Sequence, residues 1–203
     1  MKNKFSSGFT FVNLLFGLAM GGLWGVIMAD YCLKLAAQIS MPLMRLVALA
    51  ALLCLALAFV LQIVLHELGH LLFGLLSGYG FVSFRFGPRL LARCDLICRC
   101  VMCPPEPDED GYFPLSLYSL GGICLNLLSG LLFLWLYFIS GGILVLTLFS
   151  LSAGILGLGL GLMYALPLKY SDGYNALWLS DDDAALHDHW LRLREESAGE
   201  GEA

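Results

Sequence analysis

The sequence predicts an α-helical integral membrane protein with about four transmembrane helices and a short β-hairpin in one loop. Of its 203 residues, 59% are hydrophobic and only 13% are charged, whereas a typical soluble domain carries about 25% charged residues. One small soluble core cannot bury so much apolar surface, so lipid is the expected solvent. The apolar residues also form runs long enough to cross a bilayer.

We expect transmembrane helices over about residues 9–29, 43–76, 115–139 and 143–166. The second run is longer than one crossing needs, so its last part tilts strongly or continues beyond the hydrocarbon. Lysines precede the first run, as in a secretory signal peptide. No small-residue cleavage site follows cleanly, and the run is long enough to span, so a retained signal anchor is expected.

The placement of Lys and Arg predicts the orientation, because these residues accumulate on the cytoplasmic side of a membrane. With the N-terminus inside, only Lys34 and Arg45 of the 11 basic residues lie outside. Both termini are therefore expected in the cytoplasm. The chain has no basic stripe with interleaved aromatic residues, so we expect no nucleic-acid partner.

The loop between the second and third helices contains an alternating pattern. Phe84 and Phe86 alternate with polar residues, Gly87–Pro88 marks a turn, and Leu90–Leu91 follow. This pattern predicts a short hairpin over residues 81–91. The proline-rich acidic stretch after it cannot form a helix and is expected to be an extended connector.

The tail begins with a helix-start signal at Ser180 and carries Leu186, Trp190 and Leu193 at helical spacing. It predicts a short surface helix with a disordered end after Ala198. We therefore divide the chain into three parts. These are an N-terminal anchor helix and connector (1–42), a membrane core (43–179) and a cytosolic C-terminal tail (180–203).

The segment His66-Glu67-Leu68-Gly69-His70 ends the long second apolar run. Residues four apart share a helix face, so both imidazoles can reach one tetrahedral zinc ion. Glu67 can then act as general base on a zinc-bound water. Ionisable residues at membrane depth are costly and usually functional. The alternative is that these three residues merely mark the membrane–water boundary.

A catalytic zinc ion usually has three protein ligands and one open position. Asp172 is the best candidate for the third ligand, because it follows the fourth apolar run after Pro167, which stops or kinks that helix. Gly173 lets the backbone turn beside the carboxylate. The alternative is an ordinary Asp-Gly turn at a helix end.

These motifs together resemble the site-2 protease family of intramembrane zinc metalloproteases. That family has an HExxH motif on one transmembrane helix and a proline-containing Asp-Gly motif on a later one. Many members also have a Gly-Pro-x-x-Asn segment between them, which Gly122 and Asn126 match, with Ile123 in place of the proline. The sequence departs from the family at Tyr164, where Asn is common.

The resemblance implies that His66, His70 and Asp172 bind one zinc ion and that Glu67 activates water. It also implies that Asn126 lies near the site and steadies substrate or oxyanion. The implied function is a zinc endopeptidase in a bacterial cell membrane. It would cleave membrane-embedded or membrane-associated peptides in regulated proteolysis or peptide maturation, and the hairpin would pair with the unwound substrate.

Two other classes of function remain. A non-proteolytic membrane binding protein could keep the fold and the zinc, although the intact Glu67 argues against it. A small transporter or channel would need a further train of polar residues inside the membrane, which the sequence lacks.

Four of the seven cysteines cluster in the loop, at Cys94, Cys98, Cys100 and Cys103. They could form a second metal site or a redox switch. Their spacing does not match the two separated CxxC knuckles of a zinc ribbon, so a structural or incidental role is favoured.

Overall fold

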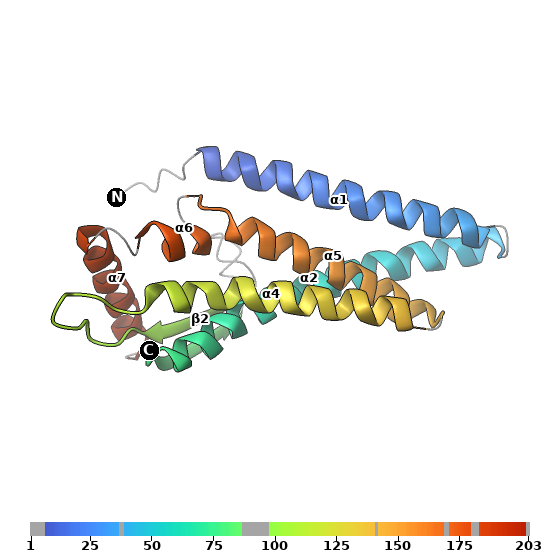
Figure 1. Ribbon diagram of the computed structural model, residues 1–203. Coiled ribbons are helices and arrows are strands. Elements are labelled where there is room, and N and C mark those ends of the chain that lie inside the picture. Colours follow the sequence, from blue (N-terminus) through green and yellow to red (C-terminus); the bar gives the residue numbers. More distant parts are fainter. Residues whose placement is uncertain are drawn as a thin grey trace. The chain divides into compact units, whose positions relative to one another are not determined.

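The computed structural model describes residues 7–36, 39–86, 98–140, 142–168, 171–179 and 183–201. Figure 1 shows its elements, which are labelled there except for β1. They are α1 (Ser7–Ala36), α2 (Met41–Leu76), β1 (Gly80–Phe86), β2 (Cys98–Cys103), α4 (Leu115–Ile139), α5 (Leu144–Ala165), α6 (Asp172–Leu177) and α7 (Asp183–Gly201).

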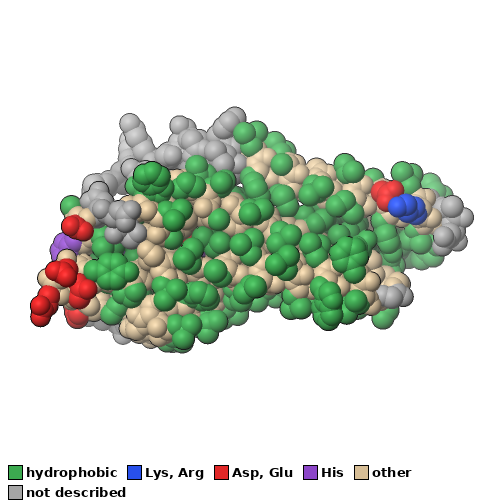
Figure 2. Space-filling model, viewed as in Figure 1, with side chains coloured by type: hydrophobic (Ala, Val, Ile, Leu, Met, Phe, Trp, Pro, Cys, Tyr) green, Lys and Arg blue, Asp and Glu red, His purple; other side chains and the backbone are tan. Residues whose placement is uncertain are grey.

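Four of the described helices are long and apolar enough to cross a membrane, as predicted. The candidate spans are Leu15–Leu35, Met41–Leu76, Leu115–Ile139 and Leu144–Ala165. Hydrophobic side chains cover most of the visible surface of these helices (Figure 2), and many of their leucines are exposed. Soluble proteins rarely expose an apolar surface of this size to water, whereas contact with lipid tails carries no such cost.

The two strands form a small antiparallel sheet whose register runs from Gly80 opposite Cys103 to Phe86 opposite Cys98. A small sheet was predicted, but its second strand is β2 and not the residues that follow Gly87–Pro88. The proposed turn and Leu90–Leu91 lie outside the described residues. The interpretation failed because β2, with sequence CRCVMC, is largely buried and shows no clear alternation of polar and apolar residues.

The chain forms two compact units. The first comprises residues 1–62 and 127–163. Within its described part, apolar side chains of α1, α2 and α5 form one core. Gln62 crosslinks this unit, because its amide donates to the Ala153 carbonyl (2.9 Å) and accepts from the Ser129 hydroxyl (3.0 Å). A fully buried amide inside a bilayer needs such partners.

The second unit comprises residues 63–126 and 164–203 and contains the sheet, α6 and α7. Its core gathers buried side chains from the segment between α2 and α4, the first residue of α4, and the part of the chain after α6. They are Tyr79, Cys100, Met102, Phe113, Leu115, Leu179 and Leu186. The Trp190 indole of α7 donates to the Pro105 carbonyl (2.8 Å), and Glu196 pairs with Arg99 of β2 (2.7 Å). The tail is therefore docked on the loop.

The predicted tail helix is present as α7, but it continues to Gly201. The expected disordered end after Ala198 is therefore wrong. The tail composition is polar, and polar residues at the end of a chain suggest disorder. A helix that docks through Trp190 and Glu196 is anchored by contacts that composition does not reveal.

Candidate metal centre

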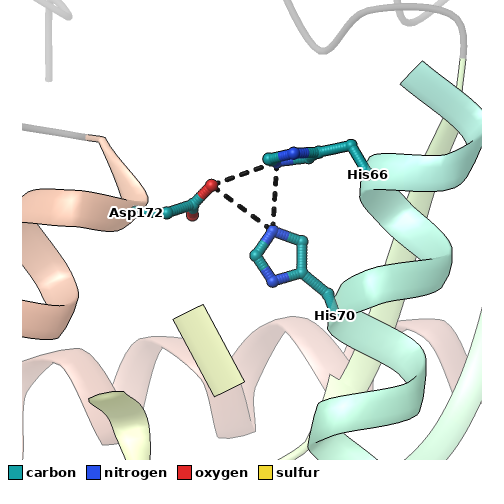
Figure 3. A group of neighbouring side chains, drawn as sticks. All are labelled: His66, His70 and Asp172. Atoms are coloured by element: carbon teal, nitrogen blue, oxygen red, sulfur yellow. Dashed lines mark hydrogen bonds and ion pairs between the residues drawn. The ribbon is translucent and has the colours of Figure 1, made fainter. Parts of the chain in front are cut away.

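The three predicted ligands lie together in the second unit (Figure 3). His66 and His70 project from one face of α2, and Asp172 faces them from the first residue of α6. The His66 Nε2 and Asp172 Oδ2 atoms are 3.0 Å apart, and His70 Nε2 lies 3.5 Å from the same oxygen. The two Nε2 atoms are 3.2 Å apart. Both imidazoles are buried.

These three atoms suit one metal ion, and they form a group with ligand atoms within 4.8 Å of one another. Ligands at about 2.0–2.2 Å from a tetrahedral ion are separated by about 3.3–3.6 Å. The three observed separations differ from that range by a few tenths of an ångström at most. Among the described residues, no other group of three His, Cys, Asp or Glu side chains could hold a metal.

The local sequence explains how Asp172 reaches the histidines. The Ser171 hydroxyl caps α6 by accepting from the Tyr174 amide (3.1 Å), and it donates to the Leu166 carbonyl at the end of α5 (2.6 Å). This pair of hydrogen bonds ties α6 to the end of α5 across the Pro167 break. Asp172 is therefore not part of a simple Asp-Gly turn but opens a short capped helix.

Gly173 has a different role from the turn that we expected. A Cβ atom at this position would collide with the backbone carbonyl of Ala165 and lie 2.9 Å from that of Tyr164. Gly173 is required because α6 crosses the end of α5 at close range. The close approach places the neighbouring Asp172 carboxylate against the histidines.

A second close contact fixes α2 against α4 at the site. Gly69, between the two histidines, and Gly121 of α4 touch through their backbones, and a Cβ atom on either would collide with the carbonyl of the other. A Cβ atom on Gly122 would lie 2.5–2.8 Å from three atoms of the His66 ring. Paired small residues are a known device for close helix packing in membranes.

Both imidazoles are oriented by α4. The Nδ1 atom of His70 lies 3.1 Å from the Tyr118 carbonyl, which can only accept, so this nitrogen carries the proton and Nε2 is left for a metal. The Nδ1 atom of His66 lies 3.1 Å from the Asn126 amide. The Tyr164 ring packs on the His66 ring with their centroids 4.3 Å apart.

Glu67 is held by the sheet. Its carboxylate accepts a hydrogen bond of 2.7 Å from the backbone N–H of Cys100 in β2. This contact fixes one carboxylate oxygen of Glu67 against β2. It was not foreseen from the sequence, because a backbone donor from a distant strand leaves no residue signature.

Comparison with known proteins gave no match. No protein-family model, curated protein or solved structure is detectably similar to this chain. The functional assignment therefore depends on the geometry and chemistry of the site.

The electrostatics of the centre favour a charged carboxylate. Burial by itself raises the pKa of Asp172, but the charge of His70 and hydrogen bonds from His66 and His70 outweigh burial. The pKa of Asp172 consequently lies below its usual range. An ionised carboxylate beside two imidazoles can bind a cation once the cation displaces the Nε2 protons of the imidazoles.

Cys98 and Cys100 of the loop do not have the chemistry of reactive thiols. Burial raises the pKa of Cys98 to about 11 and that of Cys100 to about 12, and the nearby Glu67 charge adds to both shifts. Thiols with such pKa values are protonated at neutral pH and react slowly. Cys103 is half-buried and not disulfide-bonded, whereas Cys94 lies outside the described residues. The favoured structural role fits Cys98 and Cys100.

Proposed function

We propose that this chain is a zinc-dependent intramembrane endopeptidase of the site-2 protease type. The observation that carries the proposal is the tight triangle of His66, His70 and Asp172 in a chain with helices suited to a bilayer, and Glu67 follows His66 directly on α2. Two imidazoles and one carboxylate are a donor set that zinc hydrolases use, with the fourth position left for water.

The residues divide the chemistry of peptide hydrolysis among them. A zinc ion held by the triangle supplies Lewis acidity, which makes water a good nucleophile near neutral pH. Glu67 takes the proton from the attacking water and passes it to the leaving amine. The Cys100 N–H holds one Glu67 oxygen, so the proton would be taken by the other oxygen.

The location of the site suits a membrane substrate. His66 is ten residues before the end of α2 at Leu76, which corresponds to about 15 Å along the helix. With both termini in the cytoplasm, the centre lies on the cytoplasmic side of the bilayer. A transmembrane substrate has its backbone groups paired internally, so it must unwind before Glu67 can act on it.

The outer edge of β1 can receive the unwound segment. Phe84 lies opposite Cys100, whose N–H points away from β1 to Glu67. In an antiparallel pair, two directly opposed residues either both point their N–H and C=O groups at the other strand or both point them away from it. The Phe84 N–H therefore points outward as well, where an extended substrate can pair with it.

The pairing is tested with Phe84→Pro, which removes the outward N–H. Phe84→Ala is the matched control, because it loses the same side chain but keeps the N–H. We expect cleavage to fall several-fold further in Phe84→Pro than in Phe84→Ala, with zinc content equal in both. Equal cleavage rates in the two variants would refute the pairing.

The central experiment measures zinc content and cleavage of a reporter transmembrane peptide by protein purified in detergent and returned to lipid vesicles. We expect Glu67→Gln to keep its zinc and lose cleavage. Asp172→Ala should weaken zinc binding by more than the 10- to 100-fold typical of changes at residues that contact a ligand without binding the metal. It should also lose cleavage.

The outcomes separate the competing functions. Full zinc retention in Asp172→Ala would overturn the ligand assignment. A zinc-loaded wild-type protein that cleaves no reporter, and whose Glu67→Gln variant behaves identically, would instead support a non-proteolytic membrane binding protein.

A further inference from the structure

Asn126 lies on the opposite edge of the His66 ring from the metal position. Its amide is 3.1 Å from Nδ1, whereas Nε2 faces Asp172 and His70. The Asn126 side chain is fully buried at this place. A carboxamide behind the imidazole is poorly placed to touch a substrate or an oxyanion, which would form on the Nε2 side. Its chemistry is directed at His66 itself.

We propose that Asn126 is a positioning residue that accepts the Nδ1 proton of His66 when Nε2 binds the metal. The proposal rests on the proposed zinc centre and gives Asn126 a role other than the substrate contact that the sequence resemblance implies. It follows from the donors and acceptors around the ring. When Nε2 binds a metal, Nδ1 carries the proton and needs an acceptor.

A carboxamide is suited to this position because it has both kinds of polar group. A half-turn about its last bond exchanges the oxygen and the nitrogen without changing its shape. With a proton on His66 Nδ1, the Asn126 oxygen accepts from it, and Nε2 binds the metal. Without a metal, the amide N–H2 can donate to Nδ1, and the Nε2 proton is directed at Asp172, 3.0 Å away.

The two histidines therefore have different kinds of support. His70 faces the Tyr118 backbone carbonyl, a fixed acceptor that permits one tautomer only. His66 faces an amide that stabilises either tautomer and can follow metal binding and release. We expect His70 to be preset for the metal and His66 to adjust as the metal arrives.

The rest of the His66 environment leaves the ring little freedom to move. Gly122 brings the α4 backbone against it, since any Cβ there would lie within 2.8 Å of the ring. Tyr164 packs on it with a centroid distance of 4.3 Å. With the ring held in this way, an acceptor at Nδ1 favours the tautomer whose Nε2 carries the lone pair.

The test measures the zinc Kd of three variants, two at Asn126 and one elsewhere on α4, by competition with a chromophoric zinc chelator. Asn126→Leu keeps the volume and removes the acceptor, so its zinc Kd should rise 10- to 100-fold. Asn126→Asp retains an acceptor and should stay within about threefold of wild type. Ser119→Ala, also buried on α4, is the matched control and should not change the Kd. All carry Glu67→Gln to prevent self-cleavage.

An unchanged Kd in Asn126→Leu would overturn the proposal while leaving the zinc enzyme intact. A wild-type protein that fails to bind zinc would overturn the proposed function instead. A second measurement does not depend on any variant. The chain has only 4 histidines, so 15N labelling of histidine can resolve them in the zinc-loaded protein. Zinc on His66 Nε2 with a proton on Nδ1 supports the proposal, and zinc on Nδ1 refutes it.

Discussion

Adding one methyl group at Gly121 should separate α4 from α2 and weaken the metal centre. In Gly121→Ala the new Cβ would collide with the Gly69 carbonyl and lie 2.8 Å from two further atoms of α2, whereas ordinary contact begins at 3.4 Å. The two backbones therefore have to separate by about 1 Å, since packed interiors do not absorb an extra methyl group freely.

A separation of this size stretches both contacts that orient the imidazoles. The His70–Tyr118 and His66–Asn126 distances are each 3.1 Å, and adding about 1 Å takes them beyond hydrogen-bonding range. We expect the zinc Kd to rise about 10- to 100-fold. Overpacking should also cost about 1–3 kcal/mol of stability, seen as a lower midpoint of thermal unfolding in detergent.

Gly25→Ala is the matched control, because a Cβ atom at this α1 position meets nothing within 4 Å. Both substitutions gain the same helix propensity, so their difference isolates the collision. Zinc is measured by chelator competition and unfolding by circular dichroism. A Gly121→Ala protein whose Kd and unfolding midpoint equal those of Gly25→Ala would refute the inferred crossing.

Three further predictions concern the tail, the thiols and the metal. Burial, with the nearby Arg192 charge, lowers the pKa of His189 from 6.5 to about 4. As the pH falls, His189 is therefore protonated in the undocked tail before it is protonated in the docked tail. Docking of α7 should weaken as pH falls from about 6.5 to about 4, by at most about 3 kcal/mol; amide hydrogen exchange should show this loss, and His189→Gln should abolish it. Alkylation of Cys98 and Cys100 in the folded protein should be slow at pH 8 and rise about tenfold per pH unit; fast labelling of both at pH 7 would contradict their burial. Removing zinc with a chelator should lower the unfolding midpoint, because zinc at 100 times its Kd stabilises by about 2.7 kcal/mol, and an unchanged midpoint would show that no metal is bound.

The long helices could be predicted because bilayer thickness imposes their length. The third helix agrees with its predicted bounds at both ends, at Leu115 and Ile139. That His66 and His70 lie on the same face of their helix follows in the same way from helix geometry alone. Asp172 could be proposed from its place after Pro167, because both helix ends must return to the same side of the membrane.

The remaining parts of the site depend on contacts between distant segments. The partner of β1 is β2, which a hairpin interpretation of the local sequence could not find. The crossing of Gly69 and Gly121 pairs residues far apart in the chain. A signal for it existed, since Gly121–Gly122 is a small-residue pair in an apolar helix, but the sequence does not say which helix it meets.

The Glu67 carboxylate is held by the backbone N–H of Cys100, so its anchoring does not depend on which side chain stands at position 100. Any residue except proline offers the same N–H, so position 100 can be varied widely without freeing Glu67. A saturation library over β2 should accordingly tolerate most changes at position 100 that keep the buried strand intact, and reject proline. For the engineering of this chain, the extended shape of β2 has to be kept, whereas Cys100 can be replaced by another residue that fits its buried place.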